Sequence, residues 1–343
     1  MIYSVHTFEI TLYLDTEKFG KLKNRAYEKA KRRHKIYHDD KKIGVYHDHA
    51  LIDKGIKIEY HDGTYKKKIK FIVNPTYMLG GDDVKKLWKT NDKNISKLLR
   101  KLDAYTVDYF DSKYNLNYFK LTRMDFTVNI DVGNNKTVGD YIKVLRNIGK
   151  VKGFKPKYGK YDEDTPFDYD PNHSFDLKGN SNGIDFTAYD KEADLRKKIG
   201  DKGRAKGILR VEVRLMKSEA IQKTLRRYAD DVSTTEQIGH LASNSQDIFL
   251  SIFEHIVPRG DYYKKKDAMK IIEDKIPKKS HREKMLRLLE LIPAKKSLYF
   301  AVKEMGDRNI YKVAKAFEDI NVSPVTISKR HDIKKLDSLY NYM

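Results

Sequence analysis

Every second residue is polar in three short segments of the chain, 123–131, 183–191 and 208–215. Alternation of this kind predicts β-strands with one apolar face and one polar face. If the three strands share one sheet, its polar face carries carboxylates, cations and a phenol, namely Asp125, Asp131, Tyr189, Lys191, Arg210, Glu212 and Arg214. Such a set of side chains suits chemistry on a phosphodiester, although a polar sheet face that is merely solvated shows the same alternation.

Each residue type has a defined part in that chemistry. Carboxylates such as Asp125 and Glu212 are hard oxygen ligands for Mg²⁺ or Mn²⁺, and a bound metal polarises the scissile phosphate. Arginines hold phosphate with two parallel hydrogen bonds. A tyrosine hydroxyl has a pKa of about 10 and needs a neighbouring cation or base to attack at neutral pH. Lys191, two residues beyond Tyr189 on the same predicted face, is a candidate for that cation.

The elements that must position these residues follow from the pattern of the first 216 residues. Strands are expected at Ser4–Tyr13, Ile56–Tyr60, Lys68–Asn74, Phe119–Asp131, Gly183–Lys191 and Ile208–Leu215, and helices at Thr16–His34, Asp82–Phe110 and Val138–Ile148. The order strand, helix, strand, strand occurs twice. The sequence therefore predicts an α+β catalytic domain over residues 1–216, with duplicated βαββ units pooled into one antiparallel sheet and helices on one face.

The remainder, residues 217–343, is expected to form an all-helical accessory domain. Its last part, residues 309–336, predicts a helix-turn-helix whose second helix begins at Ser323-Pro324. Lys329 and Arg330 would then face outward to contact DNA in the major groove. An ordinary helical hairpin that braces the sheet is the alternative.

Charge and composition indicate the class of partner. The 343-residue chain has 70 Lys and Arg against 49 Asp and Glu, a formal net charge of +21, which attracts polyanions such as nucleic acid. No membrane partner is expected, because no run approaches the ~18–20 apolar residues of a spanning helix. The first residues lack the pattern of a signal peptide. The absence of cysteine excludes disulfides, thiolate zinc sites and cysteine nucleophiles, and it fits a cytoplasmic location.

Four motifs occur in a recognisable order: Asn74-Pro75 after a strand, then TRMDFTVNID, FTAYDKEADL and GILRVEVRL. Over residues 57–217 this order resembles the gene II replication proteins of filamentous phages and the Rep_trans initiators of small rolling-circle plasmids, with their relaxase relatives. The resemblance implies a rolling-circle replication initiator, which nicks and rejoins one DNA strand at a specific sequence through a covalent 5′-phosphotyrosine and leaves a 3′-OH primer.

Site residues and partners follow from the same resemblance. It implies Tyr189 as the nucleophile, Lys191 as its companion lysine, and Asp125 and Glu212 as ligands of Mg²⁺ or Mn²⁺. Arg123, Arg210 and Arg214 on the strands are expected to contact DNA phosphates. The implied partners are a double-stranded origin, a single-stranded nick site, and a host helicase and polymerase, with a homodimer left open.

Several alternatives remain at this point. The His-hydrophobic-His metal motif of other initiators is absent; His47-Asp48-His49 is the nearest sequence, and His6 is either a further ligand or a core histidine. A second nucleophile has five candidates, Tyr105, Tyr109, Tyr158, Tyr161 and Tyr169. Other function classes are a conjugative relaxase, a DNA-binding regulator without enzymatic activity, and an RNA-binding sheet protein.

Overall fold

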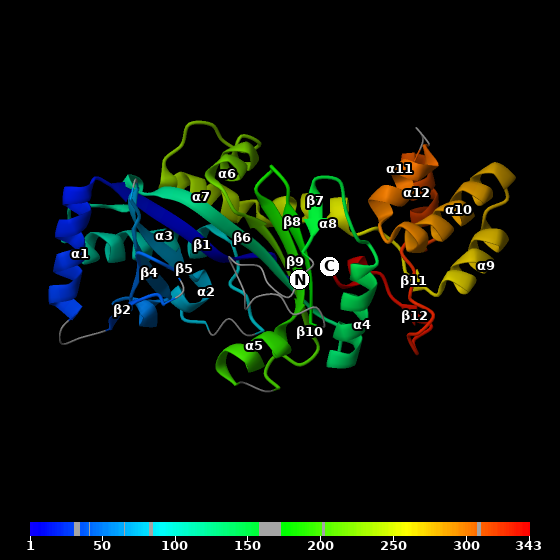
Figure 1. Cartoon of the computed structure of the whole chain (residues 1–343), viewed down its shortest axis with the longest axis horizontal. Coiled ribbons are helices and arrows are strands. Elements are labelled where there is room, and N and C mark those ends of the chain that lie inside the picture. Colours follow the sequence, from blue (N-terminus) through cyan, green and yellow to red (C-terminus); the bar gives the residue numbers. More distant parts are fainter. Residues whose placement is uncertain are drawn as a thin grey trace. The chain divides into compact units, whose positions relative to one another are not determined.

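The computed structural model describes residues 1–30, 35–40, 42–64, 66–81, 85–157, 173–200, 203–306 and 310–343. As predicted, the chain is α+β, with a large antiparallel sheet and a helical C-terminal region (Figure 1). The strands of the sheet are β1 (Ser4–Leu14), β2 (Ile36–His38), β3 (Val45–Asp48), β4 (Ile56–Asp62), β5 (Lys67–Val73), β6 (Lys120–Asp131), β7 (Phe154–Pro156), β8 (Ser174–Gly179), β9 (Ile184–Asp190) and β10 (Ile208–Leu215). Their order is β2-β3-β4-β5-β1-β6-β10-β9-β8-β7.

The expected duplication is visible in the topology. One copy consists of β1, α1 (Thr16–Ala30), β4 and β5, and the other of β6, α4 (Asn135–Arg146), β9 and β10. In both copies the last strand lies between the other two, which gives the orders β4-β5-β1 and β6-β10-β9. The first strands of the two copies, β1 and β6, pair antiparallel. The same βαββ unit therefore occurs twice.

The chain divides into two compact units, and these differ from the expected division at residue 216. The first unit contains residues 2–128 and 214–249, and the second contains residue 1 with residues 129–213 and 250–343. Helices α6 (Ser218–Leu225) and α7 (Thr234–Ser243) belong to the first unit, where α7 packs on α3 (Asp92–Tyr109). The helices after residue 216 thus do not form one separate domain.

In the first unit, α1 and α3 cover the apolar face of the strands. The ring centroids of Phe19 on α1 and Tyr60 on β4 lie 5.9 Å apart, and those of Tyr109 on α3 and Phe71 on β5 lie 5.5 Å apart. Helix α3 begins later than the sequence predicted, because the side chain of Asn91 caps it by accepting the backbone N–H of Asn94. Between β5 and α3 the described residues contain only the short helix α2 (Pro75–Met78), and residues 82–84 lie outside the described residues.

In the second unit, α4 packs on β8 and β9. Helices α9 (Lys265–Lys275), α10 (Lys279–Lys295), α11 (Leu298–Met305) and α12 (Ile310–Asp319) enclose a separate apolar cluster that includes Ile272, Leu289 and Phe317. The elements not yet given are α5 (Lys191–Ile199), α8 (Ser245–Ile256), the two-stranded sheet of β11 (Tyr262–Tyr263) and β12 (Lys335–Leu336), and the short 3₁₀ helices Ile52–Lys54, Leu116–Tyr118 and Leu339–Tyr342. Among the described helices, none is long and apolar enough to cross a membrane.

The predicted helix-turn-helix is wrong. Residues 310–343 are all described and contain α12, but no helix begins at Ser323-Pro324. Instead, the backbone N–H of Ser323 donates to the carbonyl of Asp261 and that of Ile327 to the carbonyl of Tyr263, each at a distance of 2.8 Å. A residue that precedes proline disfavours the helical conformation, and the following Val-Thr-Ile run is β-branched. These residues therefore form a non-helical segment, which is joined to residues 261–264 by isolated bridges from Val322 to Asp261 and from Ile327 to Lys264.

Candidate active site

Tyr189 and Glu212 meet on the polar face of the second unit. Tyr189 is the penultimate residue of β9, and its hydroxyl donates a hydrogen bond to Oε1 of Glu212 on β10 over 2.8 Å. The Glu212 side chain is buried, with 2% exposure, while Tyr189 is half-buried. The alternation of the two segments had predicted that these side chains share a face, and the hydrogen bond confirms it.

The surroundings of Tyr189 hold its proton on the phenol. Burial raises the pKa of the Tyr189 hydroxyl well above its ordinary value, and the negative charge of Glu212 raises it further. The positive charge of Arg210 acts in the opposite direction. The hydroxyl is therefore neutral at physiological pH, and the carboxylate that accepts its hydrogen bond is in position to receive the proton as a general base.

Arg210 lies on β10, two residues before Glu212, and is fully buried. Its Nε donates to Oδ1 of Asn129, at 2.8 Å. This hydrogen bond holds the guanidinium inside the second unit. Its positive charge lowers the pKa of Tyr189, whereas the negative charge of Glu212 raises it. The contribution of Arg210 in this structure is electrostatic, and the expected contact with a DNA phosphate stays a prediction.

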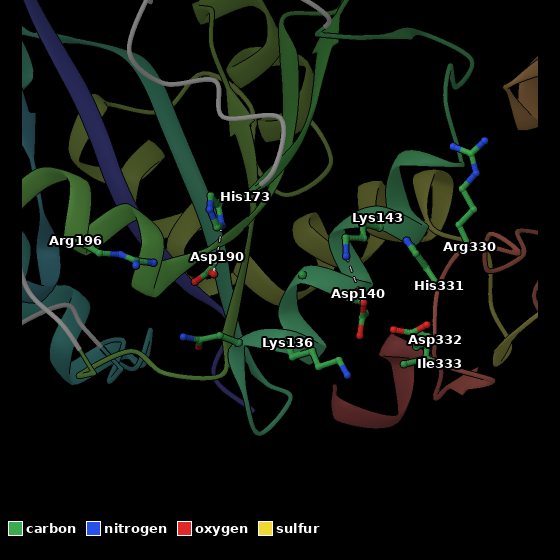
Figure 2. A pocket seen from close by; sticks show the side chains of 12 residues that line it. Lys136, Asp140, Lys143, His173, Asp190, Arg196, Arg330, His331, Asp332 and Ile333 are labelled. Carbon is green, nitrogen blue, oxygen red and sulfur yellow. Dashed lines mark ion pairs between the residues drawn. The ribbon is translucent and has the colours of Figure 1, made fainter.

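Lys191 does not occupy the strand position that alternation predicted. The strand ends at Asp190 (Figure 2). The Asp190 side chain caps α5, because it accepts hydrogen bonds from the backbone N–H groups of Glu192 and Ala193 at 2.9 and 3.1 Å. Lys191 is the first residue of that helix, and its Nζ donates to Asp194 at 3.2 Å. An aspartate followed by acidic residues is a typical helix start, so the sequence held a signal for this end of the strand. A role for Lys191 beside Tyr189 stays a prediction.

The turn before β10 fixes where Glu212 lies. Gly207 has a φ of +77°, and a Cβ there would come within 2.6 Å of the Gly133 backbone. Its N–H donates to Oδ1 of Asn135 at 2.8 Å, and its carbonyl accepts from the N–H of Val132 at 2.9 Å. Because only glycine fits this conformation and this close approach, the turn sets the start of β10 and hence the position of Glu212.

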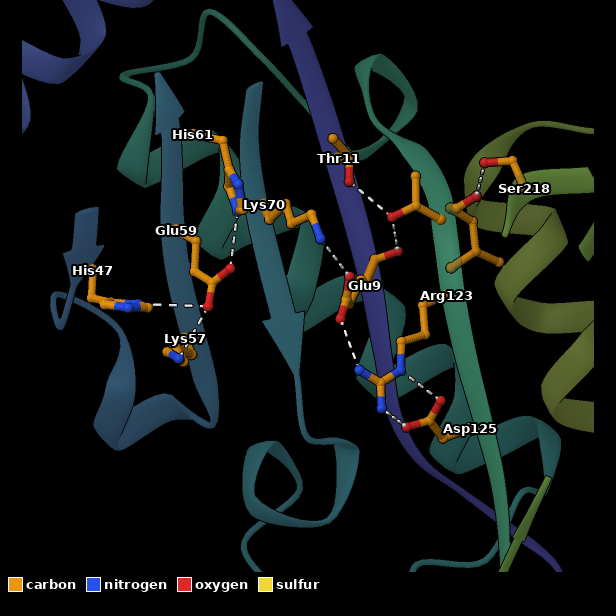
Figure 3. Close-up of polar contacts among 12 residues, drawn as sticks. Glu9, Thr11, His47, Lys57, Glu59, His61, Lys70, Arg123, Asp125 and Ser218 are labelled. Atoms are coloured by element: carbon orange, nitrogen blue, oxygen red, sulfur yellow. Dashed lines mark hydrogen bonds and ion pairs between the residues drawn. The ribbon is translucent and has the colours of Figure 1, made fainter. Parts of the chain in front are cut away.

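Asp125, the other expected acid, lies in the first unit. Nε and Nη2 of Arg123 donate to its two carboxylate oxygens at 2.8 and 2.6 Å (Figure 3). Arg123 also donates to Glu9 at 3.1 Å, and Lys70 donates to the other oxygen of Glu9 at 3.0 Å. Sequence reasoning missed Glu9, although alternation along β1 places it on the polar face. Arg123, expected at a DNA phosphate, is thus already engaged by two carboxylates.

The described residues do not form a preassembled metal site. No group of three His, Asp or Glu side chains among them could hold a metal ion. Both oxygens of Asp125 accept from Arg123, and Glu212 accepts from Tyr189. Ligation of Mg²⁺ or Mn²⁺ by Asp125 and Glu212 therefore stays a prediction, which requires these carboxylates to change partners.

The other metal candidates are also engaged elsewhere. Nε2 of His47 lies 2.8 Å from Asp39, and Nδ1 lies 3.6 Å from Glu59. Asp48 is fully buried and accepts from the Tyr109 hydroxyl at 2.7 Å, which ties one of the candidate second nucleophiles into the first unit. Nδ1 of His6 lies 3.1 Å from the hydroxyl of Thr7.

The remaining candidates are spread over both units. Tyr158, Tyr161 and Tyr169 lie outside the described residues. Arg214 belongs to the first unit, while Lys329 and Arg330 are exposed in a non-helical part of the second unit. Their expected contacts with DNA stay predictions.

Comparison with known proteins gives distant similarity to solved structures alone. No family model and no curated protein sequence matches the chain. A solved structure described as "Structure of Rolling Circle Replication Initiator Protein from Geobacillus stearothermophilus" is similar over 74% of this chain and 85% of that chain, with a TM-score of 0.35 and 11% identity. A TM-score of 0.35 is below the level that indicates a shared fold.

Proposed function

We propose that this chain nicks and rejoins a DNA strand with Tyr189, as a rolling-circle replication initiator does. The observation that carries the proposal is the 2.8 Å hydrogen bond from the Tyr189 hydroxyl to the buried carboxylate of Glu212. Two further features support it: the order of the motifs that contain Tyr189 and Glu212, and a net charge of +21 that attracts DNA.

The proposed reaction needs one proton transfer in each direction. Oη of Tyr189 attacks the phosphorus while its proton passes to Glu212, and the bond between phosphorus and the 3′ oxygen breaks. The products are a 5′-phosphotyrosine and a 3′ oxygen that takes a proton from solvent. Rejoining is the reverse reaction: a 3′-OH attacks the phosphotyrosine, and Glu212 returns the proton to the departing phenolate. The charge of Arg210 stabilises that phenolate.

The metal ion, the DNA substrates and the host partners are proposed from the order of the motifs alone. A divalent cation, Mg²⁺ or Mn²⁺, would stabilise the charge that develops on the phosphate. The substrates would be a double-stranded origin and its single-stranded nick site, with a host helicase and polymerase acting afterwards in the cytoplasm. A conjugative relaxase would carry out the same reaction at a transfer origin.

Peptide mapping of the covalent adduct tests the proposal. Purified protein is incubated with Mg²⁺ or Mn²⁺ and a supercoiled plasmid that carries the cognate origin, and protein-linked DNA is digested with trypsin. We expect nicked DNA joined to the peptide that contains Tyr189. Tyr189→Phe should give no adduct, while Tyr311→Phe, which removes a hydroxyl at an exposed position of α12, should behave as the unchanged protein.

Two results would overturn the assignment. A label on any other peptide would remove Tyr189 from the chemistry. Origin DNA that is bound but neither nicked nor linked would instead favour the DNA-binding regulator without enzymatic activity.

A further inference from the structure

Tyr13 is an exposed aromatic residue on the polar face of the sheet in the first unit. It is the penultimate residue of β1, and 47% of its surface is exposed. Alternation along β1 places it on the same face as Glu9, which accepts a hydrogen bond from Lys70 of β5 (Figure 3). Helices α1 and α3 pack on the opposite face. A sheet face with an exposed aromatic ring provides a surface on which a nucleic-acid base can stack.

Two lysines lie beside the Tyr13 ring. Lys68 of β5 is directly opposite Tyr13 in the strand register. Lys120, the first residue of β6, is directly opposite Thr11 and is therefore a diagonal neighbour of Tyr13. Its Nζ lies 5.9 Å from the centroid of the Tyr13 ring. Because β1 lies between β5 and β6, the ring has a lysine on each of its two neighbouring strands.

The charges of these two lysines are not neutralised by an ion pair within the described residues. Glu9, the carboxylate that β1 contributes to this face, already accepts from Lys70 at 3.0 Å and from Arg123 at 3.1 Å. Lys68 and Lys120 have no ion-pair partner in the described part of the chain. The surroundings of Tyr13 are therefore positively charged, and a polyanion complements them.

The pKa of Lys68 agrees with this description of the charge. Burial lowers the pKa of its ammonium group, and the positive charges of Lys70 and Lys66 act in the same direction. The more weakly opposed effects come from Glu9 and Glu59, whose negative charges raise it. A phosphate beside Lys68 would stabilise its charged form.

We propose that this face binds a single strand of DNA, with one base stacked on the Tyr13 ring and the flanking phosphates bound by Lys68 and Lys120. Every base has a π-face, so stacking of this kind recognises a single strand without reading its sequence. The site lies in the first unit, whereas Tyr189 and Glu212 lie in the second. The choice of DNA over RNA rests on the proposed nicking function, and the stacking on Tyr13 does not.

The first test replaces the stacking ring. Full-length protein that carries Tyr189→Phe is used throughout, so that nicking does not consume the probe, and the binding of fluorescent oligo(dT) is measured by anisotropy. Tyr13→Leu should weaken binding about tenfold, as expected for the loss of one stacked base, while Tyr13→Phe keeps the ring and should bind within about twofold of the parent. Tyr311→Leu is the matched control, because Tyr311 is also exposed and has Lys312 at 5.9 Å from its ring centroid, but lies on α12.

The second test measures the contribution of the lysines. The logarithm of the binding constant falls with the logarithm of the salt concentration, with a slope of about 0.7 for each phosphate of a single strand that is neutralised. Lys68→Gln and Lys120→Gln should each reduce this slope by about 0.7. The control Lys97→Gln removes an exposed charge from α3, on the opposite side of the sheet, and should leave the slope unchanged.

Three results would overturn the proposal. In the first, the Tyr13→Leu, Lys68→Gln and Lys120→Gln proteins bind oligo(dT) as the two controls do. In the second, Tyr13→Leu weakens the binding of a DNA duplex as strongly as that of oligo(dT), which would leave only a charged surface. In the third, the variants weaken the binding of oligo(U) alone, which would assign the face to RNA. Failure of the nicking function would appear separately, as the absence of an adduct in protein that retains Tyr189.

Discussion

The Tyr189 hydroxyl donates a hydrogen bond of 2.8 Å to Glu212, whereas Nζ of Lys191 donates a hydrogen bond of 3.2 Å to Asp194. Tyrosine chemistry at neutral pH needs either a cation that lowers the pKa of the phenol or a base that removes its proton. The structure provides the base, and the pKa of Tyr189 is raised. Glu212 therefore has two opposite effects. Its negative charge raises the pKa of the Tyr189 phenol before the reaction, and its carboxylate oxygen accepts the phenol proton during the attack.

Replacement of Glu212 separates these two effects. Glu212→Gln removes a negative charge that raises the pKa of Tyr189, so that pKa should fall toward its ordinary value while burial still raises it. Nicking at neutral pH should nevertheless slow by about 100-fold, because the general base is lost. Tyrosinate absorbance gives the pKa by comparison with Tyr189→Phe, and adduct formation gives the rate.

The pH dependence of nicking should change in the same variant. With Glu212 ionised, the rate should be nearly constant between about pH 6 and pH 9, since the base is already available. In Glu212→Gln the rate should rise about tenfold per pH unit, because it then follows the fraction of ionised Tyr189. Parallel profiles for the two proteins would show that Glu212 is not the base.

Asp125 should prove important for stability whether or not it binds metal. Its carboxylate is 2% exposed and accepts both of its hydrogen bonds from Arg123. Asp125→Asn leaves the Arg123 charge poorly compensated and should lower the free energy of unfolding by about 3 kcal/mol in urea titrations. The paired change of Arg123 to Met and Asp125 to Leu should recover most of that loss, and a double variant as unstable as Asp125→Asn would contradict this explanation.

Metal binding should compete with Arg123 for the same oxygens. Chelation by EDTA should abolish adduct formation and added Mn²⁺ should restore it, as the resemblance implies. Arg123→Met leaves the carboxylates of Glu9 and Asp125 without their shared partner, and Mn²⁺ affinity measured by calorimetry should then increase several-fold. An unchanged affinity would show that Asp125 is not a ligand.

Gly207 should be intolerant of any side chain. At a φ of +77°, and with a Cβ placed 2.6 Å from the Gly133 backbone, Gly207→Ala must displace the start of β10. We expect a loss of stability of roughly 2 kcal/mol and slower nicking, because Glu212 moves with the strand. Gly133→Ala, also at positive φ but with no atom within 4 Å of a Cβ, is the matched control for backbone strain alone.

The sequence by itself determined the local features. Period-2 alternation predicted which residues of β9 and β10 share a face, so the pattern alone placed Tyr189 and Glu212 on the same side of the sheet. The repeated order of elements predicted two βαββ units, and the Asp190 cap that ends β9 was also readable. These features depend on neighbouring residues only, which is why the sequence contains them.

Only the tertiary structure decided which partner each side chain and strand takes. The Ser-Pro pair at residues 323 and 324 is compatible with a helix start, but carbonyls of Asp261 and Tyr263, about 60 residues earlier, accept the backbone N–H groups of this non-helical segment. Arg330 consequently lies at a cavity with Lys136 rather than on a recognition helix. Likewise, Arg123 holds both Asp125 and Glu9 across two strands, where alternation showed only a polar face. Hydrogen bonds and ion pairs between distant segments depend on strand register and packing, which no local pattern specifies.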